Sequence, residues 1–263
     1  MKRRAVIKIG GRAFEDPAAF RELAYDILAC HDIDIALVHG GGAQISKALK
    51  KARRDTVFID GIRVTWKKDI KIVEKVLSRQ VSKQIAAQLK KQGVPVKRLS
   101  GKSGQLITAE RMIRRGRDIG YVGRVARINP SVLEHSWQRG RTPVISPISA
   151  DISGDTYNVN ADTAAGAIAG AVAAQDMVYF SDVSGVMRND EVLRELSEDQ
   201  VQSLITDGVI QGGMIAKVES AFEALKFGAE RVHITRWQGE GTLKNLIQDN
   251  LHLKTTIYGT AHG

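Results

Sequence analysis

The sequence of 263 residues predicts an α/β fold built around a parallel β-sheet. Residues 4–9 form a short apolar strand that ends at two glycines, and a segment with helical apolar spacing follows. The same order returns at once in residues 33–51, where His39 and three glycines make the turn. Two successive strand–turn–helix units imply parallel strands whose carboxyl ends face one crevice. Lys8 and both glycine turns are therefore expected at one edge of the sheet.

Later segments continue the alternation of short apolar strands with helices. Asp60-Gly61 is a typical two-residue turn and predicts a hairpin at 58–65, and apolar residues at helical spacing predict a long helix at 68–91. We expect further strands at 96–99, 119–125, 143–147, 177–180, 231–235 and 255–258, and further helices at 131–139, 197–205 and 212–227. A division near 148–153 predicts an N-terminal lobe of residues 1–150 and a C-terminal lobe of residues 151–263.

The composition is that of an ordinary globular chain, with 43% hydrophobic and 26% charged residues. The apolar run near the N-terminus is soon broken by Lys8 and glycines, which argues against a signal peptide or a membrane span. The single cysteine, Cys30, cannot form an internal disulfide, in agreement with a reducing compartment. A cytoplasmic protein without a membrane partner is therefore expected.

The formal net charge of +10 and the pI of about 9.7 indicate that anionic partners are attracted. Lys and Arg gather in four segments, 47–54, 67–75, 90–102 and 111–127, among apolar residues at helical spacing rather than among aromatic residues. This favours basic surfaces around a cleft for an anionic substrate over a nucleic-acid site, which usually adds stacking aromatics. No nucleic-acid partner is expected.

Polar side chains gather in residues 157–162, directly before a helix of small residues. Asn158, Asn160 and Asp162 stand at the mouth of that helix, where such groups cap backbone N–H groups or bind a ligand. Two lysines are equally unusual: Lys8 ends an apolar strand, and Lys217 lies in the first turn of a helix, where a cation opposes the helix dipole. Both positions suit a lysine best when an anion comes near.

Four glycine-bearing turns follow strands, and backbone N–H groups in such turns can cradle phosphate oxygens. Any one of these glycines can instead serve only a positive φ or close packing. Neither common nucleotide fingerprint is present: residues 96–103 lack the first glycine of a P-loop, and residues 39–42 lack the third glycine of a dinucleotide site. His39 is interpreted as a hydrogen-bonding strap rather than a base. Asp162 and Asp182 lack the further oxygen ligands of a protein metal cage, so Mg²⁺ is expected to arrive on a nucleotide.

Eight short motifs are spread along residues 6–218: VIKIGG at 6–11, VHGGG at 38–42, DGIRVT at 60–65, LSGKSG at 99–104, GYVGRV at 120–125, YNVNADTAAGAIA at 157–169, FSDVSGV at 180–186 and GGMIAKV at 212–218. With these motifs in this order the sequence resembles the amino acid kinase family, and within it most closely the members that phosphorylate N-acetylglutamate. The resemblance implies a three-layer αβα sandwich with a central, mainly parallel open sheet. It also implies that the N-terminal half binds the amino acid and a dimer partner, and that the C-terminal half binds ATP.

The resemblance implies a role for each part of the site. Lys8 and Lys217 match the family's two lysines that stabilise charge on the transferring phosphoryl group, with the catalytic Asp162 between them. The residues implied in substrate binding are Gly41, Gly42, Arg63, Asn158 and Asn160; Arg63 and Asn158 match the positions that hold the α-carboxylate and the acyl-amino group. The residues implied in nucleotide binding are Gly10, Gly11, Asp182, Val183, Ser184, Gly185, Val186, Met187, Val209, Ile210 and Gln211.

The implied activity is ATP-dependent phosphorylation of the side-chain carboxylate of N-acetyl-L-glutamate in arginine biosynthesis, with Mg²⁺ carried by ATP. The nucleophile is already an anion, so the reaction needs positioning and charge neutralisation rather than a general base. Two alternatives stay open. One is a kinase for aminoadipate or glutamate, acetylated or bound to an acidic carrier protein, which the NVNAD stretch argues against. The other is a non-catalytic protein that senses nucleotide or arginine, which the intact Lys8, Asp162 and Lys217 argue against.

The resemblance also bears on assembly and specificity. It implies a homodimer formed through the helix at 68–91, insensitive to arginine because no extra helix precedes the first strand. Three positions depart from the family pattern: Trp66 stands where an acidic or small residue commonly follows RVT, Ser103 replaces a frequent aspartate, and Trp237-Gln238 replaces the usual Asp-Gly. These departures leave open the acyl group and the chain length of the substrate.

Overall fold

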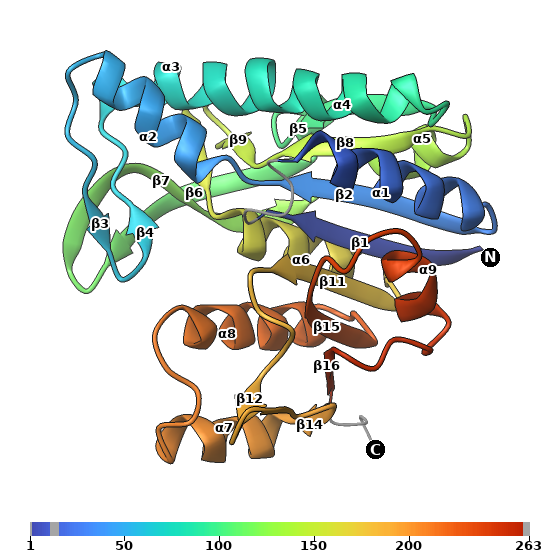
Figure 1. Cartoon of the computed structure of the whole chain (residues 1–263). Helices are drawn as coiled ribbons and strands as arrows, with labels where there is room; N and C mark the ends of the chain where they lie inside the picture. The colour runs from blue at the N-terminus through green and yellow to red at the C-terminus, as the bar shows by residue number, and fades with distance from the viewer. Residues whose placement is uncertain (1, 11–15, 260–263) are drawn as a thin grey trace.

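A central sheet of eight strands organises the molecule (Figure 1). The structure, a computed structural model, describes residues 2–10 and 16–259. Neighbouring strands run parallel except for β15 and β16, so the expected mainly parallel open sheet is confirmed. Across the sheet the strands are β14 (Glu195–Ser197), β16 (Thr255–Tyr258), β15 (Arg231–Arg236), β11 (Asp176–Ser181), β1 (Arg3–Ile9), β2 (Ile33–His39), β8 (Thr142–Ser146) and β5 (Val96–Ser100).

Helices cover both faces of this sheet, which makes the three layers of the expected αβα sandwich. The alternation of β1 decides the faces: Ala5, Ile7 and Ile9 join the apolar cluster of one layer, and Val6 joins that of the other. The first layer holds α1 (Pro17–Ala29), α4 (Ser82–Lys91) and α9 (Thr242–Ile247). The second holds α5 (Ser131–Trp137), α6 (Ala161–Ala171), α7 (Glu198–Thr206) and α8 (Gly213–Lys226).

Strand β1 joins the two halves of the chain, because it pairs with β2 on one side and with β11 on the other. In this register Lys8 lies between Val38 and Tyr179. One sheet therefore runs through both predicted lobes. The division into residues 1–150 and 151–263 stays a prediction.

A smaller set of strands extends from the sheet and was largely missed by the sequence analysis. Strands β6 (Ile107–Arg114), β7 (Arg117–Ile128), β9 (Ile148–Ala150) and β10 (Thr156–Val159) close into a small barrel. Strand β6 was not predicted, because its charged and partly exposed residues hide the period of a buried strand. Two hairpins complete the strands, one of β3 (Phe58–Ile59) and β4 (Ile62–Arg63), the other of β12 (Met187–Arg188) and β13 (Glu191–Val192).

The predicted long helix is present, but its hydrogen bonding changes in the middle. It begins as α3 (Lys67–Glu74), continues as a π-helix over Lys75–Val81 and ends as α4. π-Helical turns are rare and often occur at functional sites. Leu77 of this turn lines the hollow described below, and α2 (Gly42–Lys51) packs beside it.

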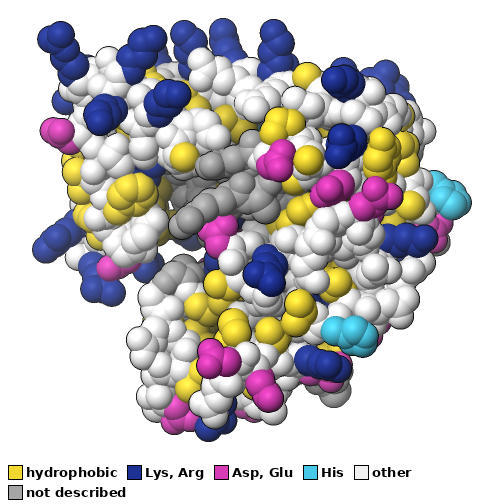
Figure 2. Space-filling view, in the orientation of Figure 1, with side chains coloured by type: hydrophobic (Ala, Val, Ile, Leu, Met, Phe, Trp, Pro, Cys, Tyr) yellow, Lys and Arg dark blue, Asp and Glu magenta, His cyan; other side chains and the backbone are white. Residues whose placement is uncertain are grey.

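The positive charge is concentrated on the segment that contains α2, α3 and α4. Residues 43–98 hold 16 Lys or Arg against four Asp or Glu, and the rest of the chain holds 23 against 25. Figure 2 shows Lys and Arg side chains along the upper edge, over these helices. Among the described helices, none is long and apolar enough to cross a membrane.

Candidate active site

Three charged residues that are far apart in the sequence meet at the carboxyl end of β1. Lys8 Nζ lies 2.8 Å from Asp162 Oδ1, and Lys217 Nζ lies 3.7 Å from Asp162 Oδ2. Lys8 is the penultimate residue of β1, Asp162 lies in the first turn of α6, and Lys217 is the fifth residue of α8. Their side chains are only 12%, 18% and 21% exposed. The structure thus brings together the three residues predicted as catalytic.

The surroundings of Asp162 keep its carboxylate ionised. Burial raises the pKa of Asp162, but the positive charges of Lys8 and Lys217 outweigh this effect, and the net pKa lies below the usual value of an aspartate. A carboxylate with a lowered pKa is a poor general base at neutral pH. Its geometry suits a strut that fixes the two ammonium groups.

Asn160 fixes the beginning of α6 and therefore the position of Asp162. Its Oδ1 accepts hydrogen bonds from the backbone N–H groups of Asp162 at 2.8 Å and Thr163 at 3.2 Å. Asn160 also lines the hollow beside the lysines. The structure therefore gives its carbonyl a capping role, and its contact with substrate stays a prediction.

A hollow of about 390 Å³ opens next to Lys8 and Asp162. Besides Lys8 and Asp162, it is lined by predicted substrate-binding residues on several elements: Gly41, Gly42, Arg63, Asn158 and Asn160. Apolar walls come from Ile45, Phe58, Ile62, Leu77, Val122, Pro147 and Val159. Convergent polar groups within an apolar hollow are typical of small-molecule sites.

Arg63 brings an unbalanced positive charge to this hollow. It is 8% exposed, and burial lowers the pKa of its guanidinium from the usual value. Nη2 donates to the Gly42 carbonyl at 2.9 Å and to Ser46 Oγ at 2.8 Å. Within the described part of the chain, no carboxylate forms an ion pair with it. A buried cation without a counter-ion is costly, so an anionic group of a ligand is expected here.

Asn158 presents a carboxamide from β10 to the same hollow. Its Nδ2 donates to Thr65 Oγ1 at 3.2 Å, and Thr65 Oγ1 in turn donates to the Arg63 carbonyl at 3.2 Å. This chain of hydrogen bonds ties the orientation of Asn158 to the hairpin that carries Arg63. Asn158 and Arg63 can thus hold two ends of one small ligand.

Two glycines allow the chain to pass close to side chains of the site. A Cβ on Gly10 would lie 2.8 Å from Lys8 Nζ, and a Cβ on Gly41 would lie 2.6 Å from Leu77 Cδ2. Gly41 precedes α2, whose start has no side-chain cap among the described residues, so first-turn N–H groups are left for an anion. Gly11, predicted to bind nucleotide, lies outside the described residues.

The predicted nucleotide-binding segments lie after β11 and before α8. Val186 and Ile210 are buried and both belong to the large apolar cluster of the second layer. Gly185 and Val186 are also fixed by packing, since a Cβ on Gly185 would lie 2.5 Å from Thr255 Oγ1, and Val186 N donates to that oxygen at 2.7 Å. The exposed members of these segments are Asp182, Val183, Met187 and Gln211, with Ser184 and Val209 half-buried. Contact of this set with a nucleotide stays a prediction.

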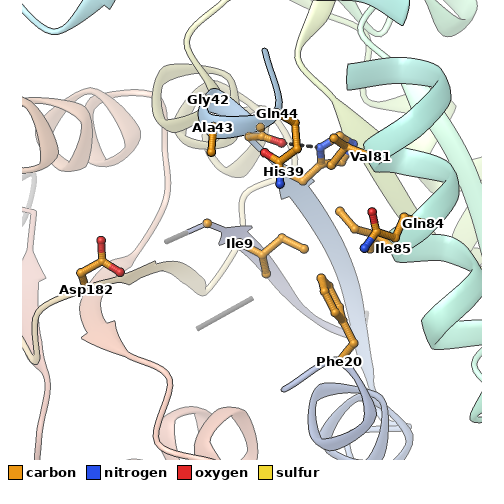
Figure 3. A pocket seen from close by; sticks show the side chains of 13 residues that line it. Ile9, Phe20, His39, Gly42, Ala43, Gln44, Val81, Gln84, Ile85 and Asp182 are labelled. Atoms are coloured by element: carbon orange, nitrogen blue, oxygen red, sulfur yellow. Dashed lines mark hydrogen bonds between the residues drawn. The ribbon is translucent and has the colours of Figure 1, made fainter. Parts of the chain in front are cut away.

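A second hollow of about 240 Å³ adjoins the first at the glycine turns (Figure 3). Gly10 and the turn 40–42 line both hollows, and Asp182 lines the second. His39 also lines it, and its Nδ1 donates to the Gly40 carbonyl at 2.9 Å. Burial lowers the pKa of His39 to about 4, so the imidazole is neutral, in agreement with a strap rather than a base.

Several residues of the site were not predicted from the sequence. Ser46, Thr56 and Phe58 surround Arg63, and the guanidinium carbon lies 4.7 Å from the centre of the Phe58 ring. The hairpin could have indicated Phe58, because a two-residue turn at Asp60-Gly61 places residues 58 and 63 opposite each other. Ser46 and Leu77 had no comparable local signal.

The three departures from the family pattern lie in structural surroundings. Trp66 precedes α3 and is 44% exposed. Ser103 Oγ accepts from the backbone N–H of Ser100 at 2.9 Å, which stabilises the loop after β5. Trp237 Nε1 donates to Glu22 of α1 at 3.0 Å, and its ring packs edge-on against Phe180. Among the described residues, no three His, Cys, Asp or Glu side chains come together as a metal site.

Comparison with known proteins agrees with this geometry. The sequence model of the amino acid kinase family matches residues 3–236. The acetylglutamate kinase of Gluconobacter oxydans (strain 621H) is 42% identical over 238 residues, which are 86% of this chain and 81% of that protein. The acetylglutamate kinase of Geobacillus stearothermophilus is 37% identical over 267 residues, covering 100% of this chain and 96% of that protein.

Among solved structures, smu.665 from Streptococcus mutans UA159 is similar with a TM-score of 0.82 and 32% identity, covering 98% of this chain and 99% of that one. The fold, the order of the motifs and these matches extend over most of the sequence. The chain belongs to the amino acid kinase family.

Proposed function

We propose that this protein is an ATP-dependent kinase that phosphorylates the side-chain carboxylate of N-acetyl-L-glutamate, giving N-acetyl-L-glutamyl 5-phosphate for arginine biosynthesis. The observation that carries the proposal is the Lys8–Asp162–Lys217 cluster beside a hollow lined by Arg63, whose guanidinium has no ion-pair partner among residues 2–10 and 16–259. The similarity to proteins named acetylglutamate kinase supports the substrate.

In the proposed reaction a carboxylate oxygen of the substrate attacks the γ-phosphorus of ATP. A new oxygen–phosphorus bond forms, the bond to the bridging oxygen breaks, and ADP leaves with that electron pair. The nucleophile carries no proton, so this chain needs no general base, in agreement with an ionised Asp162. Lys8 and Lys217 stabilise the negative charge that spreads over the phosphoryl oxygens, and Asp162 orients them.

The substrate is held in the hollow by groups at some distance from the lysines. Arg63 binds the α-carboxylate, since a guanidinium matches a carboxylate in charge and geometry. Asn158 binds the acyl-amino group, and the N–H groups at Gly41 and Gly42 bind anionic oxygens at the start of α2. Asn160 contributes its remaining amide donor to the same wall.

The nucleotide is proposed to bind in the C-terminal half, against residues 182–187 and 209–211, with Gly10 and Gly11 near its phosphates. Mg²⁺ would arrive with ATP and offset phosphate charge. A cytoplasmic location and a homodimer complete the proposal. Light scattering tests the homodimer, because a monomer or a hexamer in solution would contradict it.

Release of ADP tests the proposed activity. N-Acetylglutamate, glutamate and N-acetylaminoadipate are compared as acceptors, and N-acetylglutamate is expected to give the highest kcat/KM. Glutamate lacks the acyl group for Asn158, and aminoadipate has one methylene more between its two carboxylates. Equal use of all three acceptors would sink the proposed substrate, and absence of turnover with any of them would sink the proposed activity.

A further inference from the structure

Arg63 is fixed from several sides by other residues of the protein. Nη2 donates to Gly42 O and Ser46 Oγ, and Nη1 donates to Thr56 Oγ1 at 3.3 Å. The face of its guanidinium is covered by the ring of Phe58. An arginine side chain has many rotamers in solution, so holding it in one orientation lowers the entropic cost of binding a carboxylate.

The position of Phe58 is not explained by burial in an apolar core. The residue is 53% exposed, although a phenyl ring is normally buried in a core. It lies opposite Arg63 in the β3–β4 register and lines the proposed substrate hollow. Stacking on the guanidinium is the specific contact that an aromatic ring provides here, through the attraction of a cation to its face.

The turn of the same hairpin is anchored by Asp60. Its carboxylate lies 3.1 Å from Arg114 Nε and 2.9 Å from Arg115 Nε, both at the tip of the β6–β7 hairpin. Asp60 and Gly61 have φ values of +48° and +76°, as a tight two-residue turn requires. The hairpin that carries Phe58 and Arg63 is thus tied to the barrel at its far end.

We propose that Phe58 and Asp60 are positioning residues for substrate binding: Phe58 holds the Arg63 guanidinium from its open face, and Asp60 holds the hairpin over the hollow. This inference rests on the proposed function, because it assumes that Arg63 binds a substrate carboxylate. Both residues act on the bound substrate and neither touches the phosphoryl group. Their loss therefore raises KM for the acceptor and leaves kcat and the KM for ATP unchanged.

Phe58→Leu tests the ring, and Phe58→Tyr is its matched control. Leucine keeps apolar bulk but has no π-face, and tyrosine keeps the face and adds a hydroxyl that can point to solvent. A cation–π contact of this kind corresponds to about a three- to thirtyfold change in KM. We expect that rise for Phe58→Leu and a KM within about twofold of the wild type for Phe58→Tyr. An unchanged KM in Phe58→Leu, or an equal loss in Phe58→Tyr, overturns the role of the ring.

Asp60→Asn tests the anchor without disturbing the turn, since Asn-Gly is the preferred sequence for such a turn. The ion pairs of Asp60 are partly exposed, so the expected rise in KM is only about two- to fivefold. High salt should raise the wild-type KM in the same direction and should change the variant less. A variant with the wild-type KM and the same salt dependence overturns the role of Asp60.

The two proposals fail in different ways. If the wild type does not phosphorylate N-acetylglutamate, the proposed function fails, and the inference fails with it. If the wild type is active but the variants lose kcat rather than substrate affinity, only the inference fails. Thermal unfolding of each variant shows whether the hairpin change has spread to the fold, and a KM rise without a fall in Tm is the expected result.

Discussion

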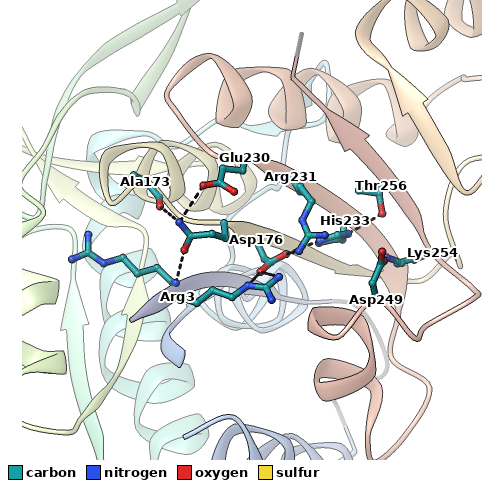
Figure 4. A network of polar contacts seen from close by, with 11 residues as sticks. Arg3, Ala173, Asp176, Glu230, Arg231, His233, Asp249, Lys254 and Thr256 are labelled. Carbon is teal, nitrogen blue, oxygen red and sulfur yellow. Dashed lines mark hydrogen bonds and ion pairs between the residues drawn. The ribbon is translucent and has the colours of Figure 1, made fainter. Parts of the chain in front are cut away.

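Two aspartates near opposite ends of the central parallel strands are each surrounded by cations, but in different ways. Asp162 stands at the carboxyl end of β1 with Lys8 and Lys217. Asp176 begins β11 and accepts from Arg3 Nε at 2.8 Å, Arg231 Nη2 at 2.8 Å and His233 Nε2 at 3.0 Å (Figure 4). The Asp176 side chain is fully buried, whereas that of Asp162 is 18% exposed.

The two clusters differ in how many hydrogen-bond donors of the cations remain available to a ligand. At Asp176 the partners lie on β1 and β15, and the second nitrogen of His233 is bonded to Thr256 Oγ1. Each lysine at Asp162 has three N–H donors. Lys217 is held only loosely, because its Nζ lies 3.7 Å from Asp162 Oδ2. The Asp176 cluster is structural, because it links the neighbouring strands β1, β11 and β15. At the Asp162 cluster, Lys8 lines the hollow and keeps cationic donors available to a ligand, which is what a phosphoryl-transfer site requires.

The largest expected effect is a loss of kcat when a lysine of the Asp162 cluster is replaced. Lys8→Ala and Lys217→Ala should each lower kcat by about 100- to 1,000-fold, because each removes a donor that stabilises transition-state charge. Steady-state ADP release checks this. Lys102→Ala is the matched control, since Lys102 bonds to Glu74 and Thr156 instead, and it should change kcat by less than about threefold. Near-normal kcat in both site variants would remove the proposed mechanism.

The second experiment removes the carboxylate of the Asp176 cluster and is expected to change stability rather than activity. Asp176→Ala leaves Arg3 and Arg231 without their buried partner, so the free energy of unfolding should fall by about 3–5 kcal/mol. Urea unfolding measures this loss, and kcat per folded molecule should stay close to the wild-type value. A stable Asp176→Ala protein with a low kcat would contradict a purely structural role, because the Asp176 cluster would then also contribute to catalysis.

The sequence could reveal one of these clusters much better than the other. Lys8 and Lys217 were predicted because each is a local misfit, a cation at the end of an apolar strand or in the first turn of a helix. The first two strand–turn–helix units were equally predictable from apolar spacing. Asp176, Arg231 and His233 follow no such local pattern, because their meaning arises only when β1, β11 and β15 lie side by side.

The same limit applies elsewhere in the fold. The π-helix at Lys75–Val81 keeps the composition of an ordinary amphipathic helix, so only the backbone hydrogen bonding of the folded chain reveals the change. Short elements such as β14 and α9 contain too few residues for a periodic signal. Phe58 lay within reach of prediction, because the turn at Asp60-Gly61 fixes the register that pairs it with Arg63.

Acid should weaken the Asp176 cluster before it affects the carboxylate itself. Burial lowers the pKa of His233, and the interaction with Asp176 offsets only part of this effect. The folded protein therefore takes up a proton at His233 less readily than the unfolded chain, and stability is lost as the pH falls below about 6.5. Asp176 has a lowered pKa in the folded state despite burial, so its contribution is lost only below about pH 4.

His233→Gln tests this order, because a glutamine Nε2 can still donate to Asp176 and does not titrate. Urea unfolding between pH 7 and pH 5 should show a flatter loss of stability in the variant than in the wild type. The loss at lower pH, from Asp176, should remain. Identical pH dependence in the two proteins would contradict the assignment to His233.

Within the active site, the smallest effect on catalysis is expected at His39, because its neutral imidazole donates to the Gly40 carbonyl and does not act as a base. Its folded pKa of about 4 lies below the unfolded value of about 6.5, so neutral His39 stabilises the protein above pH 6.5, and this contribution is lost as the pH falls towards 4. His39→Asn can keep the hydrogen bond to the Gly40 carbonyl, because asparagine Nδ2 can take the place of imidazole Nδ1. We expect kcat within about threefold of the wild type and a flatter loss of stability between pH 6.5 and 4.

His39→Leu, which cannot donate, is the comparison variant and should raise KM through a looser glycine turn. If His39→Asn abolished turnover while the turn and the stability were kept, the imidazole would take part in the chemistry, and the contrast between a structural histidine and the two working lysines would no longer hold.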